Sequence, residues 1–291
     1  MIQRLVNRYE EIAHGEIKLS ADQWGLSVYP KVRVADVISI DEVGAIGDLR
    51  RFGLQSHFDF VVCRDGWDPI YAVEFDGRFH ATAVQQERDR KKDELCRRAD
   101  FPILRINSRY LSKEFGSLSL VAWIMDVYEL QEQFYKMQES GAIPNDEPFD
   151  PFFFMNIRPS EERFPYWFSA KPRVKLQYLH KQGRIADPCS CGFIGYDQNE
   201  VMRGVEYIRV TENEGVMVRS AMNPQQFPIV FSDLLDEILF IQLAERVFKW
   251  LRGEIQSTPM GDIYAEAKAM EKEWKLARSH SYGRPAKKSA D

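Results

Sequence analysis

Three acidic residues, Asp59, Glu74 and Asp76, have a spacing that brings their carboxylates together if the chain folds into a hairpin. They flank a turn signal at residues 65–69, and apolar side chains alternate with other types on both sides of it, as expected for two β-strands. With a symmetric turn, Asp59 lies opposite Glu74 and His57 lies opposite Asp76. The three carboxylates then gather at one end of one face of the hairpin.

Such a group of acidic side chains calls for a compensating positive charge. Like charges that face each other in a sheet are destabilising, because their Cβ atoms lie only about 4.5–5.5 Å apart. A hard divalent cation would compensate, since Mg²⁺ takes oxygen ligands at about 2.0–2.1 Å, commonly carboxylates, waters and a phosphate oxygen. We therefore expect Asp59, Glu74 and Asp76 to bind Mg²⁺ or Mn²⁺. The expectation depends on the register, because a slip of one residue would place the side chains on opposite faces.

A charged helix is expected at residues 84–99, directly after this hairpin. Gln85, Arg88 and Lys92 have the spacing i, i+3, i+7, so they share one helical face. We expect this face to be turned toward the acidic group. A bound metal ion polarises a phosphoryl oxygen and lowers the pKa of a bound water, while Arg and Lys stabilise negative charge. The combination is suited to cleavage of a phosphodiester.

Two further observations concern the surroundings of the acidic group. From residue 88 to residue 98 there are six basic and three acidic residues, a local excess that favours phosphate contacts by side chains such as Lys91. For the residues of this helix that do not point to the site, an exposed and solvated helix face explains the same charges equally well. His80 lies in the loop before the helix, where it could act as a general acid or base because its pKa is near neutrality.

These segments resemble the PD-(D/E)XK nuclease superfamily, and within it the bacterial group similar to very-short-patch-repair endonucleases. The resemblance is carried, in order, by HFDFVV, AVEFDGRFH, QQERDRKKDEL and PILRI, with VYPKVRVADVI before them. It covers roughly residues 1 to 110. It implies a three-layer αβα core, Mg²⁺-dependent cleavage of nucleic acid, and metal ligation by Asp59 and Glu74, helped by the carbonyl of Phe75.

One position departs from the superfamily pattern. The motif has a lysine two residues after the glutamate, where this sequence has Asp76. In the short-patch-repair branch that lysine is often absent, and an aspartate and a nearby loop histidine occur instead, which would be Asp76 and His80. Elsewhere in the superfamily the lysine lies on the following helix, which would suit Lys92. By this resemblance Asp76 would bind a second ion, orient water, or set the pKa values of its neighbours.

Length and composition are those of a globular protein. The chain has 291 residues, a net charge of −5, 44% hydrophobic and 29% charged residues, enough for one large or two modest domains. It contains no apolar run near the roughly 18 residues of a membrane span and no signal-peptide pattern, so we expect a cytoplasmic protein without membrane contact. Four irregularly spaced cysteines exclude a disulfide framework. Cys189 and Cys191 could join His180 around zinc, but they supply only two of the four ligands that a structural site needs.

Apolar periodicity predicts the elements around the hairpin. We expect an N-terminal helix at 2–17. Its Glu10 or Glu11 could add a carboxylate to the acidic site, although glutamates in such a helix are more often simply exposed. Further elements are extended chain at 26–40, a buried strand at 102–106 parallel to its neighbour, and a helix at 114–139. A proline-rich break at 142–154 then marks a domain boundary.

The chain is thus expected to be an α/β protein with a restriction-endonuclease-like core and an appended α+β module. The expected divisions are a nuclease-like domain at 1–140, the module of unknown role at 141–278, and a disordered basic tail at 279–291. Within the module the pattern predicts a hairpin of two strands, at 205–211 and 216–221. It also predicts two helices, at 229–251 and 262–278. The broad apolar face of the first helix could serve a homodimer or a partner protein.

Several functions remain open from the sequence. The first is a metal-dependent nuclease acting on DNA, with RNA not excluded; the basic and aromatic stretch at 158–175 could add contacts to single strands. The second is a nuclease fold that has lost cleavage and binds nucleic acid or other proteins, which Asp76 in the lysine position keeps open. A glycosidase would use paired carboxylates too, but the cationic helix face suits an anionic substrate better. The acids could also be a solvated hairpin edge without function.

Overall fold

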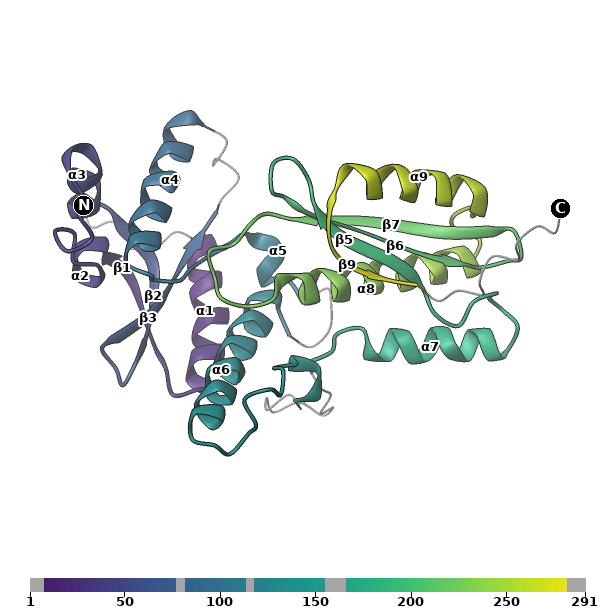
Figure 1. Ribbon diagram of the computed structural model, residues 1–291, viewed down its shortest axis with the longest axis horizontal. Coiled ribbons are helices and arrows are strands. Elements are labelled where there is room, and N and C mark those ends of the chain that lie inside the picture. The colour runs from purple at the N-terminus through teal and green to yellow at the C-terminus, as the bar shows by residue number, and fades with distance from the viewer. Residues whose placement is uncertain (1–7, 77–81, 114–117, 155–165, 282–291) are drawn as a thin grey trace. The chain divides into compact units, whose positions relative to one another are not determined.

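The chain folds into two compact units in the computed structural model, which describes residues 8–76, 82–113, 118–154 and 166–281 (Figure 1). The first unit comprises Met1–Tyr166 and Gln225–Ile229, and the second comprises Trp167–Pro224 and Val230–Asp291. The boundary therefore lies later than the expected one after residue 140. A short segment from the second half of the chain returns to the first unit.

A four-stranded mixed sheet forms the centre of the first unit. Its strands lie in the order β1 (Ser27–Arg33), β2 (His57–Arg64), β3 (Asp68–Phe75) and β4 (Ile103–Ile106). Strand β2 is antiparallel to both β1 and β3, and β4 is parallel to β3, as predicted. The parallel pairing follows from the crossover through helix α4 (Ala83–Arg98), since parallel neighbours cannot be joined by a tight turn.

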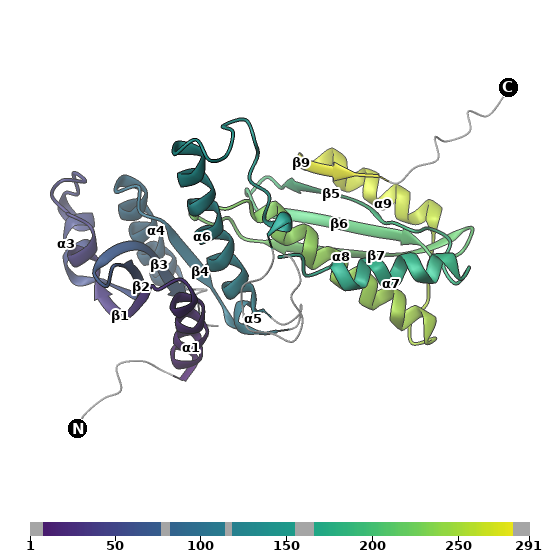
Figure 2. The same cartoon turned by 90° about the horizontal axis from the view of Figure 1, so that it is seen from below.

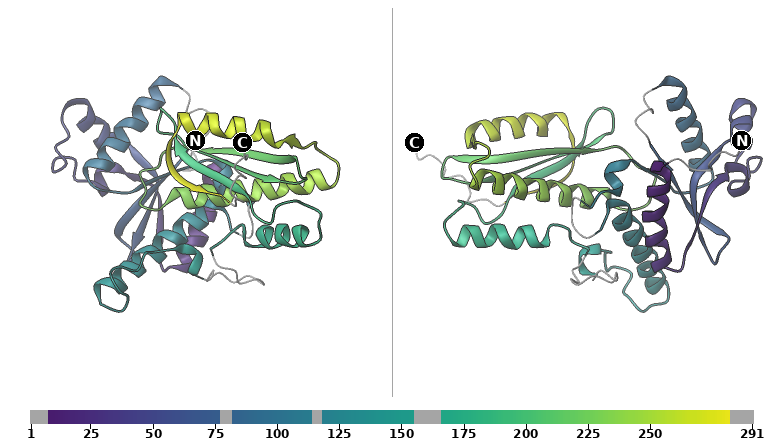
Figure 3. Two further views of the ribbon diagram at one scale, coloured as in Figure 1. Left: turned by 45° about the vertical axis from the view of Figure 1, so that its right-hand side comes forward. Right: turned by 180° about the vertical axis from the view of Figure 1, so that it is seen from behind.

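Helices cover both faces of this sheet (Figures 2 and 3). On one face lie α4 and two short helices, α2 (Val34–Val37) and α3 (Gly47–Gln55). On the other face lie α1 (Arg8–Gln23) and α6 (Leu120–Glu139): His14 of α1 stacks on Phe60, and Tyr128 of α6 meets Tyr71 edge-on. A short helix α5 (Ser108–Leu111) and a 3₁₀ turn η1 (Pro151–Phe153) complete the described part of the unit.

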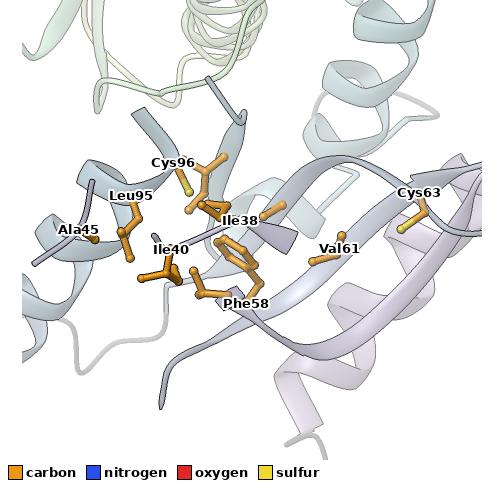
Figure 4. Close-up of a cluster of buried hydrophobic side chains, with 11 residues drawn as sticks. Ile38, Ile40, Ala45, Phe58, Val61, Cys63, Leu95 and Cys96 are labelled. Carbon is orange, nitrogen blue, oxygen red and sulfur yellow. The ribbon is translucent and has the colours of Figure 1, made fainter. Parts of the chain in front are cut away.

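The core under α4 is built from both sequence-local and distant residues. Its buried side chains include Ile38, Ile40, Phe58, Val61 and Leu95 (Figure 4). Full burial of such a side chain contributes about 1.5–3 kcal/mol, so this cluster fixes α4 against β2. Because Phe60 faces α1 whereas Phe58 packs under α4, the expected single apolar face of β2 is wrong: both faces of the sheet are buried.

Three elements of the first unit differ from their predicted bounds. The extended chain predicted at 26–40 ends at Arg33 and continues as α2. Helix α6 begins only after Ser119, whose Oγ accepts a hydrogen bond from the backbone N–H of Ala122 at 3.3 Å. A serine in this capping position stabilises a helix start, which explains the late beginning of α6. The described part of the N-terminal helix extends from Arg8 to Gln23, further along the chain than predicted.

The second unit is an antiparallel sheet between helices. The strand order is β8 (Thr258–Pro259), β7 (Glu214–Met222), β6 (Met202–Arg209), β5 (Cys191–Tyr196) and β9 (Lys275–His280). Helices α7 (Ala170–Lys181) and α8 (Phe231–Leu251) pack on one face, and α9 (Met260–Glu273) packs on the other, as Figure 3 shows. The predicted hairpin corresponds to β6 and β7, and the predicted apolar helix corresponds to α8.

The end of the second unit corrects two predictions. Helix α9 ends at Glu273 rather than residue 278, and Trp274 has an extended backbone with φ −103° and ψ 143°. Residues 275–280 then form β9 along the edge of β5, where the end of the helix and, from residue 279, the start of a disordered tail were expected. Pairing with a distant strand overrides the local helical pattern here. None of the helices in the described part of the chain combines the length and apolarity needed to cross a bilayer.

Candidate functional site

Asp59 and Glu74 face each other at the end of the β2–β3 hairpin, in the predicted register. Phe60 pairs with Val73 in the strand ladder. Beyond this pair, backbone N–H groups donate to the side-chain carboxylates of Asp59 and Glu74. The backbone N–H of Asp59 donates to Glu74 Oε1 at 3.2 Å, and that of Phe75 donates to Asp59 Oδ2 at 2.9 Å. Both acids are thereby fixed between the two strands. Their side chains are only 19% and 8% exposed, which is incompatible with a solvated hairpin edge.

Lys92 of α4 reaches the same point from the helical layer. Its Nζ lies 2.6 Å from Glu74 Oε2 and also donates to the carbonyl oxygen of His57 at 2.8 Å. The side chain is 10% exposed, and its ammonium lies 5.7 Å from the ring centre of Phe58. The core cluster under α4 thus sets the distance between helix and strand, and the predicted orientation of Lys92 toward the acids is observed.

A second lysine, which the sequence patterns did not single out, contacts Asp59. Lys31 of β1 places its Nζ 2.7 Å from Asp59 Oδ1 and 3.1 Å from Glu10 Oε1 of α1. Its backbone has φ 55°, a left-handed conformation that is uncommon for a residue other than glycine. The signal in the sequence was Pro30 just before it, because proline inside a strand marks an irregular or edge position. Glu10, rather than Glu11, is the leading-helix acid that lies near the site.

The two lysines alter the electrostatic argument for this site. Opposed acids were expected to require a divalent cation, but here Lys31 and Lys92 compensate Asp59 and Glu74. The acids do have compensating positive charge, and two lysines supply it in this structure, whereas the expected divalent cation stays a prediction. Burial raises the pKa of Glu74 to about 7; Lys92 opposes this shift, and the charge of Asp59 adds to it. A buried carboxylate that titrates near neutrality is a recognised mark of a functional site.

Asp76 belongs to a neighbouring network around Arg105. The guanidinium of Arg105, on β4, lies 3.5 Å from Asp76, 3.4 Å from Asp89 and 2.7 Å from Asp93. Desolvation lowers the pKa of Arg105, but Asp93 and Asp76 outweigh it, so the net shift is upward. Gln225 fixes the backbone of Arg105 on both sides, at 3.0 Å and 3.1 Å. A charged residue inside the short apolar run PILRI was the available signal for this network.

The remaining predicted residues have different surroundings. Gln85 donates from Nε2 to Asp89 Oδ1 at 3.1 Å, and Arg88 is exposed, without an ion pair to any residue that the structure describes. Lys91 pairs with Asp48 of α3, so its ammonium is directed to that helix rather than to Glu74. His80 lies outside the described residues. Glu74 therefore contacts both Asp59 and Lys92, as predicted for one site. Asp76 and Gln85 lie in the neighbouring network around Arg105 instead.

Comparison with known proteins adds a family without an assigned role. Residues 2–115 match the model of a family described as "Protein of unknown function (DUF2726)". This segment contains all four strands of the first sheet and every charged residue of the site described above. No curated protein matches the chain. No solved structure matches it.

Proposed function

We propose that the first unit is a metal-dependent nuclease of the PD-(D/E)XK type, which hydrolyses phosphodiester bonds in DNA. The contact between Lys92 and Glu74 carries this proposal, because a buried ammonium 2.6 Å from the hairpin glutamate is where the superfamily lysine would act if displaced to the helix. The sheet of four strands with helices on both faces, and a helical crossover before the parallel strand, supports the same assignment.

The donor set of the site fits a hard cation. Asp59 and Glu74 would hold Mg²⁺ or Mn²⁺ through carboxylate oxygens, together with the carbonyl of Phe75, and these are the ligand types that such ions take. A bound ion would supply an activated water and polarise the phosphoryl oxygen. Lys31 would remain with Glu10 when Asp59 turns to the ion, since it already contacts both carboxylates.

The other residues have roles that follow from charge and exposure. Lys92 would stabilise negative charge that develops on the scissile phosphate. Arg88 is exposed on the same helix and would contact a neighbouring phosphate, together with Gln85 one turn earlier on the helix. Asp76, held by Arg105, would adjust the charge around Glu74. His80 would exchange a proton with the attacking water or the leaving oxygen, a role that histidine often has in catalysis.

A second function is favoured by one specific observation. Because Lys31 and Lys92 already compensate the two acids, the site is electrostatically satisfied without a metal ion. The unit could therefore be a nuclease fold that binds nucleic acid or a protein partner without cutting. In either case we propose a cytoplasmic location, since no disulfide joins the chain's four cysteines, all within the described ranges, and thiols persist in a reducing compartment.

Cleavage assays separate the two functions. The full chain is incubated with plasmid, linear duplex and single-stranded DNA, and with RNA, in Mg²⁺ or Mn²⁺ and in EDTA. We expect metal-dependent cleavage that Glu74→Gln and Lys92→Met abolish. Lys91→Met is the matched control, because it removes a lysine one position away that pairs with Asp48 instead, and it should cut like the wild type. Binding without cutting by the wild type and by Glu74→Gln alike would refute the nuclease and favour the second function.

A further inference from the structure

Three residues of the second unit lie side by side across its sheet. Gly192 of β5 pairs with Glu206 of β6 on one side and with His280 of β9 on the other. Residues opposite each other in a sheet share a face, so Glu206 and His280 are separated only by a residue without a side chain. Asp236 of α8 approaches this row from the helix that covers the same face (Figure 1).

The side chains of Glu206, Asp236 and His280 converge on one point. His280 Nε2 lies 2.9 Å from Glu206 Oε1, and His280 Nδ1 lies 3.8 Å from Asp236 Oδ1. One donor atom from each of the three residues lies within 4.8 Å of the other two. The side chains of Glu206 and Asp236 are 1% and 9% exposed, and that of His280 is 35% exposed.

Glu206 has one carboxylate oxygen to which its described neighbours make no hydrogen bond. Its Oε2 is buried and has no hydrogen-bond partner among the residues that the structure describes. A Cβ built on Gly192 would lie 1.9 Å from this oxygen, so the glycine leaves the space that Oε2 occupies above β5. A buried acceptor without a partner costs about 1–3 kcal/mol, and more when it is charged. The unsatisfied oxygen indicates a missing ligand at this point.

The charges of the neighbourhood also call for a cation. Glu237, next to Asp236, is bound by the backbone N–H of Ser169 at 2.6 Å and by its hydroxyl at 2.7 Å. Arg173 serves both acids, at 3.5 Å from Glu237 and 3.4 Å from Asp236. With Glu206 this makes three buried carboxylates against one arginine. When all three carboxyl groups are ionised and His280 is neutral, the single arginine leaves this group with a net negative charge.

We propose that Glu206, Asp236 and His280 bind a divalent transition-metal ion, for which Zn²⁺ is the best fit. Zinc accepts imidazole nitrogen at about 2.0–2.1 Å and carboxylate oxygen at about 2.0–2.2 Å, whereas Mg²⁺ prefers oxygen ligands alone. A divalent ion offsets the negative charge of this group and gives Glu206 Oε2 a partner. Three protein ligands leave a fourth position for water. Because the ligands come from β6, α8 and β9, the ion would tie the last strand to the sheet and to the helix.

Zinc binding by the full chain tests this proposal without any activity assay. The EDTA-treated protein is dialysed against Zn²⁺ and the bound metal is counted, for the wild type, Glu206→Gln and His280→Gln. We expect each variant to lose one zinc ion relative to the wild type. Two controls exclude other ligands: Glu74→Gln removes an acid of the first unit, and the Cys189→Ser, Cys191→Ser double variant removes the two partly buried thiols of the second unit. Both controls should keep this zinc ion.

Melting temperatures distinguish a metal site from a simple ion pair between His280 and Glu206. In EDTA, Glu206→Gln should melt no lower than the wild type, because it removes the charge of a buried carboxylate whose Oε2 has no partner among the described residues. In Zn²⁺ the wild type should melt higher than the variant, because ligand binding to the folded state stabilises it. The proposal is overturned if wild type and Glu206→Gln bind equal amounts of zinc, or if the variant melts lower by the same margin with and without zinc. In that case a proton on His280 supplies the balancing charge.

Discussion

Replacing Lys92 with methionine removes the ammonium that lies 2.6 Å from Glu74 Oε2, with little change in side-chain volume. Both side chains are about nine-tenths buried, so solvent screens this pair only weakly. At a pH where Glu74 is ionised, the variant buries a carboxylate without its partner. Breaking a buried ion pair on one side costs about 3–5 kcal/mol, and we expect the unfolding free energy of the first unit to fall by that amount.

The loss should depend on pH in a defined direction. The pKa of Glu74 in the folded protein is about 7, above its ordinary value of 4.5. An acid with a raised pKa stabilises the fold fully below its ordinary value and loses that contribution as the pH rises through about 7. Near pH 5 Glu74 is therefore mostly protonated, and Lys92→Met should cost only the lost hydrogen bond to His57, about 1–3 kcal/mol. Above pH 8 the full cost should appear.

Urea denaturation at the two pH values, followed by circular dichroism, measures this difference. The double variant Glu74→Gln, Lys92→Met removes both charges and should recover most of the loss, since replacing both partners is far less costly than replacing one. Lys91→Met is the matched control and should change little at either pH, because its partner Asp48 is on the surface. An equal loss at both pH values, or a double variant no more stable than Lys92→Met, would refute the reasoning.

Two further predictions concern Lys31 and Glu237. Lys31→Met should strengthen Mn²⁺ binding about two- to fivefold in calorimetry, because a partly exposed ion pair with Asp59 and Glu10 is worth at most about 1 kcal/mol; unchanged or weaker binding would count against a metal at Asp59. Burial raises the pKa of Glu237 to about 7, although its bonds to Ser169 lower it, so the stability of the second unit should fall as the pH rises from about 5 to about 8. Glu237→Gln should flatten this slope in thermal melts, and an unchanged slope would place the titration elsewhere.

The hairpin and its helix could be predicted because their signals are local. Alternation around the turn set the pairing of β2 with β3, and the residues nearest Asp59 and Glu74 keep the predicted register. A bulge between Val62 and Cys63 shifts the pairing only on the turn side. The i, i+3, i+7 spacing on α4 identified the face of Lys92, since helical geometry alone determines which residues share a side. The parallel strand β4 followed from the length of the connection.

The misplaced and missed features depend on contacts between distant segments. Residues 275–280 form a strand because β5 offers an unpaired edge, which no local pattern reveals. The sequence pattern allows Arg105 to be an exposed charge, but three aspartates surround it, one directly after β3 and two on α4. The row of Glu206, Gly192 and His280 joins residues that are far apart in the chain. Strand pairing across the sheet created that row.

By itself the sequence determined which residue types stand where: two acids facing each other across a turn, and a lysine on the following helix. Local geometry suffices for this, because strand alternation and helical period are properties of neighbouring residues. Only the tertiary structure decided how the charges are balanced. Lys31 reaches Asp59 from another strand through a left-handed backbone position, and a packed core sets the distance from Lys92 to Glu74. Electrostatic energies depend on distance and burial, which are fixed only when the layers are assembled.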